Sequence, residues 1–157
     1  IAPPTLEAPP VQLGVWLAQR SRWLKGFLQT WFVLMRTPAA SMREMGPAGF
    51  VSMQLTLGAA ILSAMVHGPW ALWCLLCACV PGLSLGPLGT GVMIVSYLAG
   101  VATGVAAPAH RGRRPLIAAL TAPLYWPLQS VAMARALYGL CHAPHFWAKT
   151  PHGAPSA

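Results

Sequence analysis

Residues 88–107, LGTGVMIVSYLAGVATGVAA, form a run of 20 residues without a charge. As an α-helix this run would be about 30 Å long, which matches the hydrocarbon thickness of a bilayer. Ser96, Gly100 and Gly104 recur at every fourth position and therefore share one face, where a neighbouring helix can approach closely. The run predicts a membrane-spanning helix.

Three further apolar blocks flank this run. Residues 49–66 predict another span, about 27 Å long as a helix. Its small-residue ridge, again at every fourth position, consists of Ser52, Thr56, Ala60 and Ala64. His67-Gly68-Pro69 predicts a tight turn, and the shorter block 70–83 either crosses the membrane or is re-entrant. Residues 116–134 contain two prolines and predict a kinked span.

The expected fold class is therefore an all-α membrane protein with about three to four transmembrane helices between residues 49 and 140. Four crossings return both termini to one side, but they place the basic run 111–114 opposite Arg20 and Arg22, against the positive-inside rule. A re-entrant block at 70–83 restores that rule and moves the C-terminal tail, residues 141–157, to the other side. Both counts remain open.

An amphipathic helix is expected over residues 11–37, before these spans. Its apolar positions recur at helical spacing, whereas Gln19, Arg22, Gly26 and Gln29 fall on another face. Tryptophans and cations on such a helix are typical of a helix in the membrane interface, and the alternative is a surface helix packed on a soluble domain. The proline-rich segment 1–10 predicts a linker, and 38–48 predicts a polar connection.

Composition excludes an ordinary soluble domain. The 157 residues are 56% hydrophobic and only 8% charged, against roughly 25% charged in soluble domains. A formal charge of +8 would suggest nucleic acid in a soluble protein. Here the basic residues stand between apolar blocks, as membrane anchors do, so we expect a lipid bilayer and no nucleic acid as partner. Arg135, near the end of the last block, is expected to snorkel to the headgroups.

No metal site is expected. Cys74, Cys77 and Cys79 have short spacing, but Leu and Ala separate them within an apolar block, which favours buried thiols over a zinc site. His142, His145 and His152 flank the C-terminal aromatic residues without a fourth ligand or an acid, which favours interfacial anchoring by Phe146, Trp147 and Lys149.

The residues that carry chemistry are Gln19, Arg22 and Trp23, spaced i, i+3, i+4 on one helix face. A guanidinium binds phosphate oxygens with paired hydrogen bonds. An indole offers a flat apolar face to a sugar ring, and the amide can reach hydroxyl or phosphate. The set is suited to a sugar polymer and a nucleotide diphosphate.

The pattern Q-x-x-R-W on a helix just before membrane spans resembles the signature of processive family 2 glycosyltransferases, the family of bacterial cellulose synthase. The run QRSRWLKGFLQTW at 19–31, the upstream TLEAP at 5–9 and the closing PHFWAKTPHG at 144–153 look like a bacterial subgroup of these enzymes. The resemblance spans nearly the whole chain.

The resemblance implies an enzyme that transfers sugar from a nucleotide sugar to a growing polysaccharide in the bacterial inner membrane, with the amphipathic helix on the cytoplasmic side. Trp23 would lie beneath the acceptor sugar, and Gln19 and Arg22 would lie near the diphosphate. Trp147, Lys149 and Thr150 would belong to a possible gating loop.

The family transfers sugar with Asp residues that hold a metal-nucleotide complex and deprotonate the acceptor, whereas this chain has no Asp. We therefore expect a C-terminal fragment that is inactive alone, with residues 1–10 leaving a missing catalytic domain. Magnesium or manganese is expected in the complete enzyme, and no cofactor in this chain. A degenerate homologue or a wrong reading frame is the other explanation.

Two different functions compete with sugar transfer. The chain would be a small multi-pass membrane scaffold or transporter subunit if Gln19, Arg22 and Trp23 only anchor a helix. It would be a cationic protein acting on anionic lipid if its basic residues carry the function.

Overall fold

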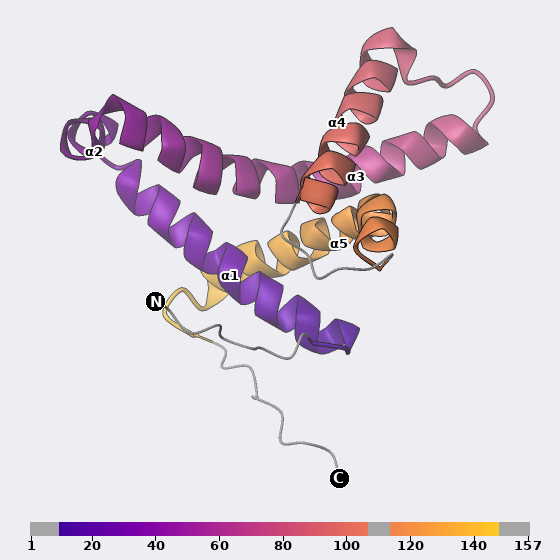
Figure 1. Ribbon diagram of the computed structural model, residues 1–157. Coiled ribbons are helices and arrows are strands. Elements are labelled where there is room, and N and C mark those ends of the chain that lie inside the picture. The colour runs from indigo at the N-terminus through magenta and orange to yellow at the C-terminus, as the bar shows by residue number, and fades with distance from the viewer. Residues whose placement is uncertain (1–9, 107–113, 148–157) are drawn as a thin grey trace. The chain divides into compact units, whose positions relative to one another are not determined.

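The computed structural model describes residues 10–106 and 114–147, which are helical and contain no strand, as the sequence predicts (Figure 1). The elements are α1 (Leu13–Leu34), α2 (Pro38–Met53), the π-helix η1 (Gln54–Gly58), α3 (Ala59–Cys79), α4 (Gly86–Ala106) and α5 (Arg114–His142). The linker expected at 1–10 lies outside the described residues except for Pro10.

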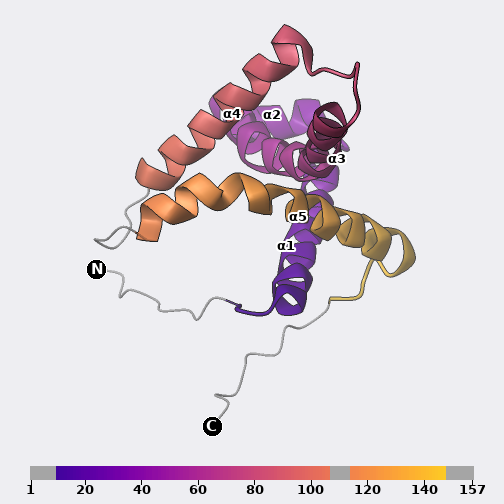
Figure 2. The same ribbon diagram turned by 90° about the vertical axis from the view of Figure 1, so that its right-hand side faces the viewer.

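The chain divides into two compact units. The first combines Ile1–Ile61 with Ala132–Ala157, and the second is Leu62–Val131. The boundaries fall inside α3 and α5. In the first unit α1 and the last part of α5 cross, as both ribbon views show (Figure 1 and Figure 2).

In the first unit, α1 confirms the helix expected over 11–37, with slightly narrower bounds. Its buried residues recur on one face and are Trp16, Leu24, Lys25 and Leu28. The buried residues that α5 contributes to this unit are Ala132, Met133 and Ala136. Two of these three are alanines, whose small side chains let another helix approach closely.

The polar connection expected at 38–48 is helical, because α2 begins at Pro38. Proline at the first helical position lacks only a donor that the helix would not use there, and its φ is already helical. The hydroxyl of Ser41 donates to the Leu34 carbonyl at the end of α1, at 2.8 Å. The chain departs from helical geometry only at Gly46, whose φ is 72°.

The π-helix η1 is joined to α1 through a side-chain network. The indole N–H of Trp31 donates to Gln54 Oε1 at 2.9 Å, and Gln54 Nε2 lies 3.2 Å from the sulfur of Met35. Five residues in π geometry shift every later side chain around the helix axis. The predicted ridge of small residues is interrupted here: Ser52 and Thr56, before or within η1, are exposed, and Ala64 beyond it is buried.

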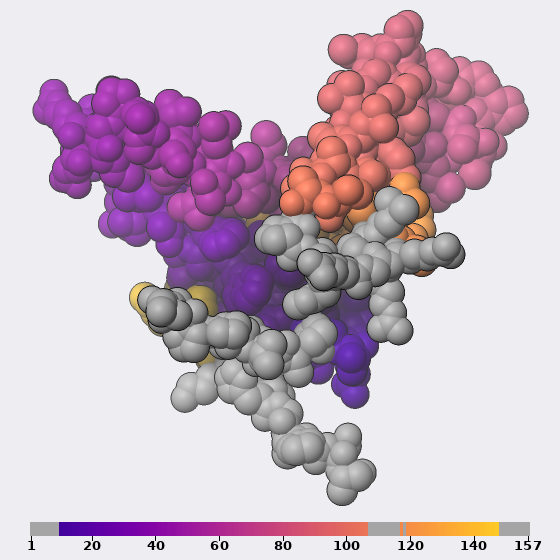
Figure 3. Space-filling model, viewed as in Figure 1, coloured from indigo at the N-terminus to yellow at the C-terminus, as the bar shows by residue number. Residues whose placement is uncertain are grey.

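By length and composition, two stretches of described helix can cross a membrane. One is Pro38–Cys79, which joins α2, η1 and α3 over 42 residues, and the other is α4, which confirms the helix predicted at 88–107. Figure 3 shows α4 at the surface, and none of its residues is buried. The span expected at 116–134 lies within α5, whose first side chains are outside the described part, so the number of crossings remains a prediction.

The turn predicted at residues 67–69 is wrong, because α3 continues through Pro69. The hydroxyl of Ser130 accepts from the Gly68 N–H at 2.7 Å and donates to the Ala64 carbonyl at 2.6 Å. The hydroxyl thus bridges the Gly68 N–H and the Ala64 carbonyl, which would be hydrogen-bonded to each other in an ordinary α-helix. The helix continues past Pro69, whose missing N–H would have bonded a different carbonyl, that of Met65.

In the second unit, α4 packs against the first part of α5, as Figure 2 shows. A Cβ atom at Gly100 would lie 2.6 Å from Cη2 of Trp126, and one at Gly104 would lie 2.8 Å from Cβ of Ala119. The prediction that these two glycines form a packing face is therefore confirmed. Glycine is required at both because any side chain would overlap α5.

Candidate functional site

Gln19, Arg22 and Trp23 lie on α1, within the first unit. The helix confirms the i, i+3, i+4 geometry that the spacing implies, so the three side chains leave the same face. Gln19 and Arg22 are half-buried, and Trp23 keeps 41% of its surface exposed. An indole that is accessible beside an amide and a guanidinium is therefore present on this helix.

Arg20 is the residue of this site that sequence reasoning misses, since its position and charge indicate only a membrane anchor. Its guanidinium carbon lies 4.7 Å from the ring centroid of Trp23 and 5.6 Å from that of buried Trp16. Both distances are typical of cation–π contacts. The spacing of Trp16, Arg20 and Trp23, i, i+4, i+7, is the signal present in the sequence.

The Arg20 contact restricts how Trp23 can be used. The Nε atom of Arg20 is buried and has no hydrogen-bond partner within the described residues, as expected for a guanidinium stacked on aromatic rings. Because a cation covers part of the indole, the remaining exposed surface is the part that can receive a ligand. The contact also limits the rotation of Trp23 and so orders this surface before any ligand binds.

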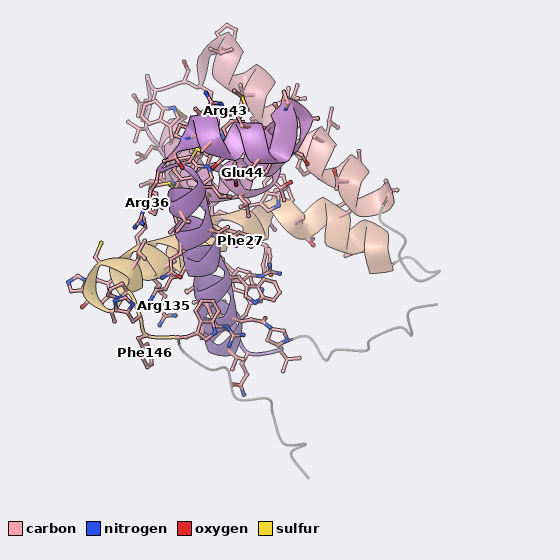
Figure 4. The ribbon with its side chains drawn as sticks, turned by 90° about the vertical axis from the view of Figure 1, so that its left-hand side faces the viewer. Phe27, Arg36, Arg43, Glu44, Arg135 and Phe146 are labelled. Carbon is pink, nitrogen blue, oxygen red and sulfur yellow. The ribbon has the colours of Figure 1, made fainter. Side chains whose placement is uncertain are left out.

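Lys25 fastens the segment after α5 onto α1. Its side chain is only 7% exposed, and Nζ donates to the carbonyl of Ala143 at 2.6 Å and to that of Phe146 at 2.9 Å. These carbonyls follow the end of α5 at His142, where the helix dipole favours a cation. Figure 4 shows Phe146 beside α1, with Arg36 toward the other end of that helix.

Two neighbours of Lys25 complete this attachment. Gln29 Nε2 donates to the carbonyl of Pro144 at 3.0 Å. At Gly26, a Cβ atom would lie 3.4 Å from Cη2 and 3.9 Å from Cζ3 of Trp147. The structure thus brings Trp147, which the resemblance assigns to a possible gating loop, onto the helix that carries the motif. The other two residues of that assignment, Lys149 and Thr150, lie outside the described residues.

No donor set for a divalent metal occurs in the part of the chain that the structure describes, since no group of three or more His, Cys, Asp or Glu comes together there. Cys74, Cys77, Cys79 and Cys141 are free thiols. The described residues therefore offer no site for the magnesium or manganese that the resemblance implies for the complete enzyme, and no chemical step through a metal is derived from them. What these residues can do is bind a ring, a hydroxyl and an anion.

Comparison with known proteins adds no relative, because no protein-family model, no curated protein and no solved structure matches this chain.

Proposed function

We propose that this chain is the membrane-embedded, acceptor-binding part of a glycosyltransferase that transfers sugar from a nucleotide sugar to a growing polysaccharide. The observation that carries the proposal is the Q-x-x-R-W face of α1, with its half-exposed Trp23, on the helix that precedes the long apolar stretch Pro38–Cys79. The proposed family is that of processive family 2 enzymes similar to bacterial cellulose synthase.

Each motif residue has one role in this proposal. The exposed part of Trp23 stacks on a pyranose ring of the acceptor, because the C–H groups of the sugar meet the negative face of the indole. Arg22 neutralises the diphosphate that remains after the sugar leaves, with charge-assisted hydrogen bonds. Gln19 contributes an amide that binds hydroxyl or phosphate.

The remaining features of the proposal follow from the resemblance. α1 lies in the cytoplasmic interface of a bacterial inner membrane, followed by three to four crossings that surround the product. Deprotonation of the acceptor hydroxyl and metal binding are assigned to carboxylates that these 157 residues do not contain, since the chain has no Asp. The partners are the nucleotide sugar, the glycan acceptor and lipid.

The test compares two activities of the complete enzyme in membranes. Trp23→Ala should lower polymer elongation about tenfold, equivalent to about 1.4 kcal/mol, while hydrolysis of the nucleotide sugar changes little. The reason is that the acceptor platform is lost and the diphosphate contacts remain. Phe32 is the matched control, because it is 47% exposed and leaves α1 about 180° away from Trp23. An equal loss of both activities would contradict the assigned roles.

The alternative, a membrane scaffold or transporter subunit, is favoured by one observation. Arg20 and Lys25 both serve contacts inside the protein, as the cations of a purely structural helix would. In that case Trp23→Ala alters stability and assembly, and no activity that consumes a nucleotide sugar is found in membranes containing the protein.

A further inference from the structure

Gly26 lies in the middle of the motif face of α1. Successive residues of a helix are about 100° apart, so Gly26 is about 60° from Trp23 and about 40° from Arg22 around the axis. It also lies only about 5 Å along the axis from Trp23. A residue without a side chain therefore leaves a gap within the surface that Trp23 and Arg22 border.

The indole of Trp147 lies next to this gap, within van der Waals distance of a Cβ atom placed at Gly26. Its contact with Gly26 is made by Cη2 and Cζ3, which belong to the edge of the six-membered ring. The other atoms of the indole lie more than 4 Å from that Cβ position. Trp147 accordingly keeps 50% of its surface exposed, close to the 41% of Trp23.

Three hydrogen bonds hold the backbone that carries Trp147. Lys25 binds the carbonyls of Ala143 and Phe146, and Gln29 binds the carbonyl of Pro144. A further bond joins the Phe146 N–H to the Ala143 carbonyl at 3.1 Å. The indole is thus presented by an ordered segment, so its position costs little conformational entropy when a ligand binds.

We propose that Trp147 is a second aromatic platform of the acceptor site, binding a pyranose ring of the same glycan chain that Trp23 binds. Gly26 is the position of α1 that Trp147 contacts, which we call its seat, and Lys25 and Gln29 are the positioning residues. The inference rests on the proposed function, because it takes the ligand of Trp23 to be a glycan. Trp147 meets α1 at Gly26, less than one helix turn along the axis from Trp23, and two aromatic side chains at one helix suit an oligomer better than a single sugar.

The test uses the complete enzyme in lipid nanodiscs, with 5-fluorotryptophan in place of tryptophan. Fluorine resonances of Trp23 and Trp147 are assigned from Trp23→Phe and Trp147→Phe. Tetrasaccharides of β-linked glucose, mannose and N-acetylglucosamine serve as probes. We expect one of them to shift both resonances, and Trp147→Ala to weaken its binding about fivefold, as loss of one aromatic contact would.

Gly26→Leu and Gly14→Leu form a matched pair for this experiment. Both change a glycine of α1, but a Cβ atom at Gly14 has nothing within 4 Å. Gly26→Leu should displace Trp147, abolish its response to the probe and leave that of Trp23, while Gly14→Leu should preserve both. This pair keeps the test decisive if Trp147→Ala does not fold.

The outcomes separate the two proposals. A probe that shifts Trp23 but never Trp147 overturns the second platform and leaves the proposed function intact. A failure of all three probes to shift Trp23 counts against both. An unchanged Trp147 response in Gly26→Leu also overturns the inference, because the seat would then have no influence on binding.

Discussion

Lys25 in the first compact unit and Ser130 in the second both bring a side-chain donor to backbone carbonyls, yet they do so at different places on a helix. Lys25 binds carbonyls beyond the end of α5, where no helical partner exists. Ser130 stands within α3, between Ala64 and Gly68, which would otherwise bond each other. The first contact adds bonds beyond the helix, one of them to a carbonyl that also accepts from the Phe146 N–H, whereas the second takes the place of a helical bond.

The surroundings of the two contacts also differ, one being a charged contact near a helix end and the other a closely packed one. A cation is stabilised at a helix C-terminus by the dipole, and Lys25 is held there by carbonyls alone within the described residues. Around Ser130 the packing relies on close approach, since a Cβ atom at Gly68 would lie 2.6 Å from that of Ser130. The Lys25 contact therefore depends on charge and polarity, and the Ser130 contact depends in addition on the small size of Gly68.

The largest expected effect is that of Lys25→Met. It removes a buried donor from two carbonyls, and we expect the free energy of unfolding to fall by about 3 kcal/mol. Hydrogen exchange at the Phe146 amide should accelerate as well. Thermal unfolding in detergent and exchange measured by mass spectrometry check this. Exposed Arg36→Met is the control and should stay within about 0.5 kcal/mol; equal effects would mean that the attachment stabilises nothing.

The next effect is that of Gly100→Ala in the second unit. The added methyl overlaps the ring of Trp126, and overpacking of this kind costs about 2 kcal/mol. A methyl group added at Gly91, on the same helix, would meet nothing within 4 Å, so Gly91→Ala should stabilise through helix propensity. Melting curves of the two variants should move in opposite directions. Parallel shifts would show that α4 does not pack on α5 through Gly100.

The smallest effect is expected for Ser130→Ala, at about 0.6 kcal/mol, the average for interhelical hydrogen bonds in membranes. Loss of the hydroxyl allows Gly68 to bond Ala64 directly, which offsets most of the cost. Hydrogen exchange at the Gly68 amide, measured in Ser130→Ala and in the control Ser96→Ala, checks this prediction. Ser96 is exposed, so its substitution should leave the exchange rate unchanged. A loss as large as that of Lys25→Met would erase the distinction between a replaced bond and a supplied one.

The elements that the sequence predicts correctly are those whose signal is local. The helix at 11–37 and the one at 88–107 follow from apolar spacing and from the absence of charge, and α1 and α4 agree with them within a few residues. The turn predicted at 67–69 is wrong because α3 continues through Pro69. The hydrogen bond that Gly68 makes there goes to Ser130, 62 residues away, and no local pattern indicates it. The helical conformation of the connection at 38–48 is not predicted, because Pro38 can begin a helix as well as end one.

The candidate site likewise contains features with a local sequence signal and features without one. The common face of Gln19, Arg22 and Trp23 needs only helical spacing, and the sequence predicts it. The approach of Lys25 to Ala143 bridges 118 positions, and no periodicity in the sequence indicates it. Arg20 is an intermediate case, because its spacing to two tryptophans is visible but its positive charge suggests an anchor.

The π-helix η1 contains one extra residue, which affects how the sequence maps onto the two sides of this helix. A turn of this kind contains one residue more than α-helical winding would, so a one-residue deletion within Gln54–Gly58 would restore ordinary winding. Five residues in this wider winding turn about as far around the axis as four α-helical residues, so the side chains after the deletion would keep their directions. Ile61, which is buried now, would stay on the same side of the helix. The extra residue is therefore taken up within one turn, whereas a deletion in the α-helical part of this stretch would rotate every later side chain by about 100°.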